Sequence, residues 1–203
     1  GRIEDIRECI GCNICYAHDS LGVPIRCTQN PTMGEEWRFG WHPEKIRKKK
    51  SPKRVLVVGA GPSGLEAARV LGEQGNDVIL AEATRNLGGR VIKESNLLGL
   101  AEWRRVSDWR ITQINKLSNV EIYRESELVA KDVTELNADF VMIATGAKWS
   151  EDALGRHSDT GFETVDANMI IGAEHVLNGE KIDGDRIVIY DDDHYYIGSV
   201  MAL

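Results

Sequence analysis

The sequence predicts an α/β fold, a parallel sheet wound with helices on both faces, from two observations. Continuous apolar runs at residues 55–58, 78–81 and 140–144 are typical of strands that are buried on both faces. Helical patterns separate these runs, at residues 62–74 and at residues 103–117, where apolar side chains recur at roughly helical spacing. This alternation predicts a doubly wound, Rossmann-like nucleotide-binding fold.

A glycine-rich turn joins the first strand to the first helix as a G-x-G-x-x-G motif. Its candidate ligand-binding residues are Gly59, Gly61, Pro62, Ser63 and Gly64. Such glycines let the backbone approach a pyrophosphate, while the helix N-terminus offers N–H donors. Glu82 follows the second strand, at the distance expected of a carboxylate that accepts hydrogen bonds from a ribose diol. A plain glycine-rich turn would explain the glycines but not Glu82.

Two further segments stand where parallel strands end. Gly88-Gly89-Arg90 combines small residues with a cation that suits a phosphate, and Ala144-Thr145-Gly146 lies where the chain leaves the sheet. A simple turn and a solvated arginine are the alternative reading of the first segment. The remaining candidates for nucleotide contact are Ala83, Gly88, Gly89, Arg90, Val129, Ala144, Thr145 and Gly146. Together with Glu82 they favour an ADP-containing ligand, ADP or FAD.

All four cysteines stand near the start of the chain. Cys9, Cys12 and Cys15 form two Cys-x-x-Cys steps that share the middle residue, and Cys27 follows. Three closely spaced thiolates with a fourth further along suit a [4Fe–4S] cluster. Zinc is an alternative, although its Cys₄ sites normally use two separated pairs. Four buried free cysteines would leave the spacing unexplained.

The chain is organised in four zones. Residues 1–44 form the turn-rich cysteine segment, and residues 45–54 form a linker in which seven of ten residues are Lys or Arg. Residues 55–149 form the nucleotide-binding domain. Residues 150–203 begin a second nucleotide-type domain, with a strand expected at 186–190 and a helix from residue 197. The chain has no initiator Met and stops inside this unit, so we expect a piece of a longer polypeptide.

The second strand-to-helix turn reads Asp191-Asp192-Asp193 where a dinucleotide site would need glycines. Because carboxylates repel a pyrophosphate, we expect this turn not to bind NAD(P)H.

Charge and hydropathy exclude several classes of protein. The formal net charge of −7 argues against nucleic-acid binding, which favours a basic face. No apolar run approaches the roughly 18 to 20 residues that span a bilayer, and the polar N-terminus is unlike a signal peptide. We therefore expect a cytoplasmic protein without a membrane partner.

Several stretches, spread over essentially the whole chain, match one known group. They are Cys9–Cys15, Cys27–Asn30, Gly34–Glu44, Gly59–Gly64, Gly88–Gly89, Ala144–Gly146 and Asp191–Asp193. On these residues the chain resembles the dimethylamine/trimethylamine dehydrogenase and histamine dehydrogenase group, iron–sulfur flavoproteins of the NADH:flavin oxidoreductase/2,4-dienoyl-CoA reductase family. The cysteine segment and the Trp-His-Pro-Glu segment within Gly34–Glu44 are its specific parts.

The resemblance implies a protein with an N-terminal FMN-bearing (β/α)₈ barrel, a [4Fe–4S] segment and two nucleotide-type domains. In this group, substrate is oxidised at the flavin and electrons leave singly through the cluster to an electron-transferring flavoprotein. The nucleotide site of this group holds ADP. The barrel is absent from the chain, so FMN would come from elsewhere in the polypeptide or from a partner chain, and no catalytic residue is assigned.

Two other functions remain open. An NAD(P)H-dependent enoyl-CoA or flavin reductase would carry FAD here, but that subgroup places its third cysteine one residue beyond Cys15 and keeps glycines where this chain has Asp191 to Asp193. A zinc-stabilised, non-catalytic nucleotide-binding scaffold is the alternative from another class. We also expect a homo-oligomer.

Overall fold

The computed structural model describes residues 1–42, 44–152, 154–155, 159–161, 170–184, 186–191 and 197–201. The chain divides into two compact units. The first comprises Gly1–Ile92 and Glu102–Gly146, and the second comprises Lys93–Ala101 and Ala147–Leu203.

The first unit is built on a four-stranded parallel sheet in the order β3-β2-β1-β4. Its strands are β1 (Arg54–Val58), β2 (Asp77–Ala81), β3 (Val120–Tyr123) and β4 (Phe140–Ile143). The strand order reverses at β1, which pairs with β2 on one side and with β4 on the other. Ligands of doubly wound folds bind at the carboxyl ends of strands at such a switch point. The predicted α/β, Rossmann-like fold is confirmed.

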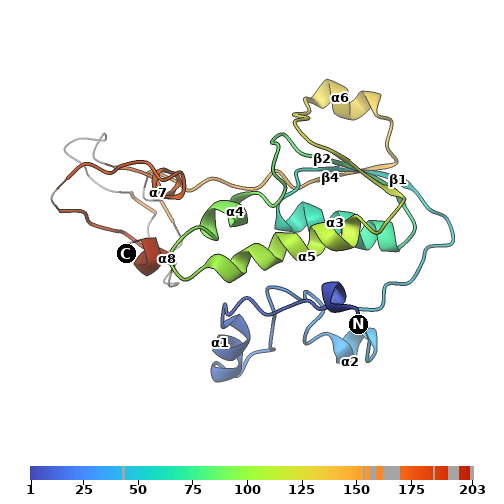
Figure 1. Ribbon diagram of the computed structural model, residues 1–203, viewed down its shortest axis with the longest axis horizontal. Coiled ribbons are helices and arrows are strands. Elements are labelled where there is room, and N and C mark those ends of the chain that lie inside the picture. Colours follow the sequence, from blue (N-terminus) through green and yellow to red (C-terminus); the bar gives the residue numbers. More distant parts are fainter. Residues whose placement is uncertain are drawn as a thin grey trace. The chain divides into compact units, whose positions relative to one another are not determined.

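Helices lie on both sides of this sheet, as Figure 1 shows: α3 (Pro62–Glu73) and α5 (Arg105–Ile114) on one side and α6 (Ala130–Glu135) on the other. The core between the sheet and the first two helices contains Val57, Leu65, Leu80 and Ile114, all at most 1% exposed. Burying each of these side chains contributes about 1.5–3 kcal/mol.

Helix α3 has the start and stop signals that its sequence predicts. Pro62 occupies the first turn, where its missing N–H and fixed φ suit a helix start. At the other end Gly75 adopts a φ of +91° and its N–H donates to the Gly72 carbonyl at 2.8 Å. A glycine in this conformation ends a helix without steric penalty.

The cysteine-bearing segment packs against the side of α5 that faces away from the sheet (Figure 1). It contains η1 (Ile3–Asp5), α1 (Ile14–Ser20) and α2 (Glu36–Phe39), short helices that the sequence did not predict. Side chains of α5 hold it, since Trp109 Nε1 donates to the Asp5 carbonyl at 3.3 Å and Gln113 Nε2 to the Glu4 carbonyl at 2.9 Å. Two further short helices, α4 (Arg90–Glu94) and η2 (Ala101–Arg104), each span a boundary between the two units.

The prediction that β4 is buried was wrong. All four of its residues are exposed, with Phe140 at 59% and Ile143 at 79%. The physical reason is that β4 is an edge strand among the described residues, where it pairs with β1 alone and its side chains have neighbours on one side only. Its apolar composition identified a strand but not its partners.

The second unit contains α7 (Ala173–Leu177) and α8 (Ile197–Met201). The predicted helix from residue 197 is therefore confirmed as far as Met201. The strand predicted at 186–190 is wrong, because these residues form no ladder in the described structure and Val188 is 92% exposed. Of the acidic turn, Asp191 is described and residues 192–196 lie outside the described part. Within that part, no helix is both long and apolar enough to cross a bilayer.

Candidate functional site

The three glycine-containing segments converge at the carboxyl end of β1. Gly59 has a φ of +98°, and a Cβ added to it would lie 2.4 Å from the Ala144 carbonyl oxygen. A Cβ on Gly64 would lie 1.8 Å from the Gly59 carbonyl oxygen, and one on Gly89 would lie 3.0 Å from the Gly61 Cα. Backbones approach here more closely than a side chain would permit. The geometry is the glycine cradle that pyrophosphate recognition requires.

The first turn of α3 opens at this cradle. Gly61 is its N-cap and makes no side-chain cap hydrogen bond, and Pro62 has no N–H. Ser63 is exposed and an added Cβ on Gly61 would meet nothing within 4 Å. The N-terminal N–H groups and the positive end of the helix dipole are therefore suited to an anion.

Glu82 lies beside the cradle and is only 9% exposed, so its carboxylate needs hydrogen-bond partners within the protein. Its Oε2 accepts from the Ala60 N–H at 2.8 Å. Its Oε1 accepts from the N–H and the hydroxyl of Thr84, both at 2.9 Å. Oε1 thus already accepts two hydrogen bonds, whereas Oε2 accepts one and keeps a lone pair that could accept from a ribose hydroxyl. Thr84 was not predicted as part of the site.

The other predicted nucleotide-binding residues differ in how far they are buried. Gly88 is buried and its N–H donates to the Ala60 carbonyl at 2.8 Å, while Arg90 begins α4 and is exposed. Ala83, Thr145 and Gly146 are also exposed. Val129 caps α6, and its N–H donates to Asp132 Oδ2 at 2.9 Å. For all of the predicted nucleotide-binding residues the cofactor contact stays a prediction.

The cysteine loops have the backbone donors that thiolates require. The Gly11 N–H donates to Cys9 Sγ at 3.3 Å, and the Asn30 N–H donates to Cys27 Sγ at 3.3 Å. Cys12 Sγ lies 3.2 Å from Thr28 Oγ1, so the cysteine motif touches the loop that carries the fourth cysteine.

The four thiols are not gathered around one point. Cys9 and Cys15 are exposed, and no three His, Cys, Asp or Glu side chains among the described residues lie close enough together to hold a metal ion. The donor set nevertheless fits an iron–sulfur cluster, because four thiols stand in two adjoining loops and the first turn of α1, and two of them already accept N–H···S hydrogen bonds. That Cys9, Cys12, Cys15 and Cys27 bind metal stays a prediction.

Two arginines of α5 hold both cysteine loops. Arg105 Nη1 donates to the Cys9 carbonyl at 2.9 Å. Arg110 donates to Gln29 twice, to its side-chain Oε1 at 2.9 Å and to its carbonyl at 3.0 Å. Gln29 Nε2 in turn donates to the Glu8 carbonyl at 3.0 Å and ties the two loops together. The helix that packs on the nucleotide fold is therefore also the anchor of the cysteine segment.

A buried ionic network surrounds Arg110. Its Nε donates to Glu66 Oε2 at 2.8 Å, and Arg69 Nη2 donates to Glu66 Oε1 at 2.6 Å. Burial works against ionisation of Glu66, but Arg69 and Arg110 outweigh it and lower the pKa of this carboxyl. Burial lowers the pKa of Arg7, which stacks on Trp109 at 3.9 Å, to about 10, so this guanidinium remains charged at neutral pH.

This network was missed at the level of sequence, although a signal for it exists. Val106, Arg110 and Ile114 recur at intervals of four, so Arg110 occupies a core-facing position of an apolar helix stripe. A charged residue at such a position is rarely buried unless it is paired. Its partner Gln29 is too far along the chain for any spacing rule to identify.

The comparisons with known proteins agree with this geometry. The family model for pyridine nucleotide-disulphide oxidoreductase matches residues 29–177. Dimethylamine dehydrogenase of Hyphomicrobium sp. (strain x) is 43% identical over 210 residues, which cover 100% of this chain and 28% of that protein.

Two solved structures are also similar over nearly the whole chain. Histamine dehydrogenase from Rhizobium sp. 4-9 superposes with a TM-score of 0.92 at 50% identity, covering 100% of this chain and 30% of that one. The 6-hydroxypseudooxynicotine amine oxidase of Pseudomonas geniculata N1 has a TM-score of 0.92 at 44% identity, covering 98% of this chain and 30% of that one. The predicted resemblance is confirmed, and the chain spans less than a third of the length of these relatives.

Proposed function

This chain belongs to the pyridine nucleotide-disulphide oxidoreductase family, and from that premise we propose that it is the iron–sulfur and ADP-binding portion of a flavin-dependent amine dehydrogenase. The observation that carries the proposal is the 50% identity to histamine dehydrogenase over the whole chain at a TM-score of 0.92. The cradle and the two cysteine loops lie within the matched region.

The nucleotide part of the proposal is supported by the cradle at the end of β1. Gly59, Gly61 and Gly64 would admit the pyrophosphate to the backbone, and the first turn of α3 would donate N–H groups to it. Glu82, already oriented by Ala60 and Thr84, would accept from the ribose hydroxyls. As in the amine dehydrogenase group that the chain resembles, the nucleotide would serve structure rather than chemistry.

The cysteine part is supported by the donor set and its backbone hydrogen bonds. Cys9, Cys12, Cys15 and Cys27 would hold a [4Fe–4S] cluster, which when bound accepts and releases one electron at a time. The N–H groups of Gly11 and Asn30 would stabilise the negative charge on the sulfurs.

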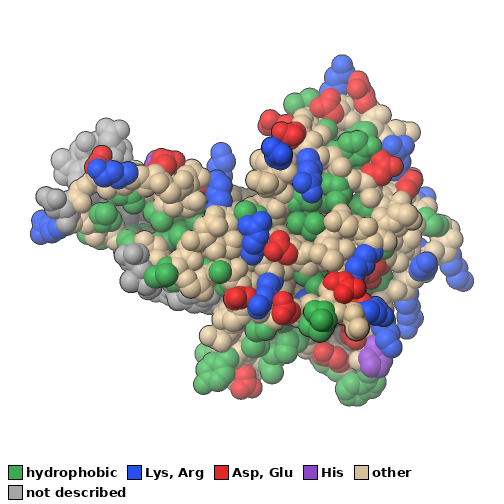
Figure 2. Space-filling view, in the orientation of Figure 1, with side chains coloured by type: hydrophobic (Ala, Val, Ile, Leu, Met, Phe, Trp, Pro, Cys, Tyr) green, Lys and Arg blue, Asp and Glu red, His purple; other side chains and the backbone are tan. Residues whose placement is uncertain are grey.

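Two partners complete this proposal. An FMN-bearing barrel, in the same polypeptide or a partner chain, would perform the amine oxidation. Figure 2 shows hydrophobic side chains gathered on the surface over α1 and α2, where Tyr16, Trp37 and Phe39 are each at least 67% exposed. We propose that the barrel covers this surface. An electron-transferring flavoprotein would be the acceptor.

Two analyses of the purified protein test the proposal. Iron and acid-labile sulfide should be present in amounts that match one [4Fe–4S] cluster per chain. Zinc without sulfide would contradict the proposal and favour a structural scaffold. Mass spectrometry of the nucleotide released on denaturation should identify ADP, in line with electron exit through the cluster. Release of FAD would instead favour an NAD(P)H-dependent reductase in which this domain itself carries electrons.

A further inference from the structure

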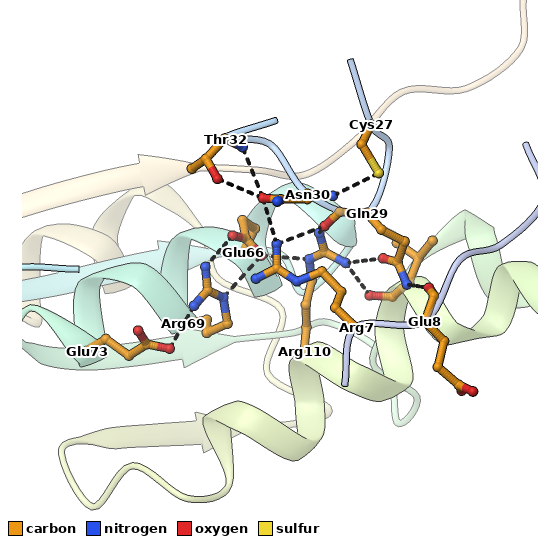
Figure 3. Close-up of polar contacts among 11 residues, drawn as sticks. Arg7, Glu8, Cys27, Gln29, Asn30, Thr32, Glu66, Arg69, Glu73 and Arg110 are labelled. Carbon is orange, nitrogen blue, oxygen red and sulfur yellow. Dashed lines mark hydrogen bonds and ion pairs between the residues drawn. The ribbon is translucent and has the colours of Figure 1, made fainter. Parts of the chain in front are cut away.

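The loop that carries Cys27 is fastened to the nucleotide fold through one buried cation. Figure 3 shows Arg110 between two groups, the Gln29 backbone and side chain on one side and Glu66 of α3 on the other. Arg110 is 3% exposed and Gln29 is 2% exposed. Asn30, the next residue along, donates its N–H to Cys27 Sγ. Hydrogen bonds therefore connect Arg110 with the Cys27 thiol through Gln29 and Asn30.

The charges around this loop do not cancel. Arg7, Arg69 and Arg110 face the carboxylates of Glu66 and Glu73, with ion pairs of 2.6 Å from Arg69 to Glu66, 2.7 Å from Arg69 to Glu73 and 2.8 Å from Arg110 to Glu66. Arg7 donates to the Gln29 carbonyl at 3.0 Å instead of to a carboxylate. Among the residues that the structure describes, three guanidiniums therefore oppose two carboxylates in this network, and the surplus positive charge lies next to the Cys27 loop.

We propose that Arg110 and Glu66 are positioning residues that set the reduction potential of the iron–sulfur cluster, an inference that rests on the proposed function. Arg110 holds the Cys27 loop and supplies positive charge, and Glu66 opposes part of that charge. A cluster with thiolate ligands becomes more negative on reduction, so nearby positive charge favours the reduced form and raises the potential. Burial strengthens the effect because screening by solvent is weak there.

If Arg110 and Glu66 set the potential, substitutions that neutralise them should shift it in opposite directions, which a purely structural role would not predict. Arg110→Gln removes positive charge and should lower the potential. Glu66→Gln removes negative charge from the same ion pair and should raise it. We expect each change to alter the ratio of reduced to oxidised cluster at a fixed potential about tenfold, which is about 59 mV for a one-electron couple. Arg110→Lys keeps the charge and should restore most of the wild-type potential.

Matched controls separate this effect from general charge changes. Arg104 precedes α5, is 54% exposed and pairs with Asp108, so Arg104→Gln should leave the potential unchanged. Glu73 pairs with Arg69 and makes no ion pair with Arg110 in the described structure, so Glu73→Gln should raise the potential less than Glu66→Gln does.

The experiment is a redox titration of the purified protein followed by electron paramagnetic resonance, with iron and sulfide measured for each variant. Opposite shifts in Arg110→Gln and Glu66→Gln at full iron content would support the proposal. Unchanged potentials, or shifts in the same direction, at full iron content would overturn it while leaving the proposed function intact. If Arg110→Gln assembles no cluster, Glu66→Gln against Glu73→Gln decides the matter in the same way. Absence of iron from the wild-type protein would overturn the proposed function and this inference with it.

Discussion

Replacing Gly64 by alanine should separate the structural from the ligand-binding role of the glycine motif. The added Cβ would lie 1.8 Å from the Gly59 carbonyl oxygen, although real Cβ atoms essentially never come within 3.0 Å of such an atom. Because the obstructing group is backbone, α3 and the glycine turn must move apart by more than 1 Å. Overpacking of this kind costs about 1–3 kcal/mol.

Gly61→Ala is the matched control. Gly61 has a φ of −69° and a ψ of −179°, which alanine adopts readily before proline, and its Cβ would meet no atom within 4 Å. We therefore expect no loss of stability from this substitution. The methyl group would stand in the space left open for the pyrophosphate, so nucleotide content should fall.

Thermal unfolding of nucleotide-free protein, followed by circular dichroism, measures the first effect. The midpoint of Gly64→Ala should fall by roughly 2–12 °C, whereas that of Gly61→Ala should match the wild type. Chromatography of the released nucleotide measures the second effect. A Gly64→Ala protein as stable as the wild type, or a Gly61→Ala protein that keeps its full nucleotide content, would refute this reasoning.

Three other predictions concern charged residues. Glu82→Gln should weaken ADP binding, measured by calorimetry, at least about tenfold, because hydrogen bonds to a charged group contribute about 1.5–3 kcal/mol. Thr84→Ala should weaken ADP binding less. Equal affinities of the two variants for ADP would contradict this. Arg105→Gln frees the Cys9 carbonyl and should speed iron loss to a chelator, whereas the exposed Arg104→Gln should not; equal rates would exclude the anchoring role. Burial opposes the shift, but Arg69 and Arg110 lower the pKa of Glu66 below 4.5, so its stabilisation is present above that pH and is lost as pH falls through the lowered pKa. The difference in unfolding midpoint between wild type and Glu66→Gln should accordingly shrink as the pH is lowered from 4.5, and a difference that does not change with pH in this range would be inconsistent with it.

The nucleotide fold was predictable because local signals agreed with one another. The apolar run at 55–58, the glycines from Gly59 to Gly64 and the carboxylate of Glu82 each follow from short-range chemistry. In the structure they lie together because parallel strands end at one edge of the sheet. A fold can be predicted from a sequence when strand propensity, turn chemistry and packing all favour the same structure.

The errors arose where structure depends on distant partners. Phe140 to Ile143 and residues 186–190 have the same apolar, β-branched character, yet only the first forms a strand in the described structure. Strand formation needs a neighbouring strand, and β1 provides one for the first segment alone among the described residues. The strand at Val120–Tyr123 was missed because it is short and half polar.

For the cysteine segment, the sequence predicts candidate ligands, which stay a prediction, but not the side chains that hold the segment in place. Regular spacing identifies Cys9, Cys12 and Cys15 without knowledge of the fold. Arg110 and Gln29, which anchor the loop of the fourth cysteine, lie 81 residues apart and meet only because α5 packs on the cysteine segment. Long-range polar contacts of this kind leave no periodic trace in a sequence.

We propose above that the four cysteines hold a redox-active iron–sulfur cluster. Electron paramagnetic resonance of the purified, dithionite-reduced protein tests it most directly, with Cys12→Ser for comparison. We predict the signal of a reduced [4Fe–4S] cluster in the wild type and its loss in Cys12→Ser. A wild-type protein that contains zinc and gives no signal, or a signal unchanged in Cys12→Ser, would contradict the claim.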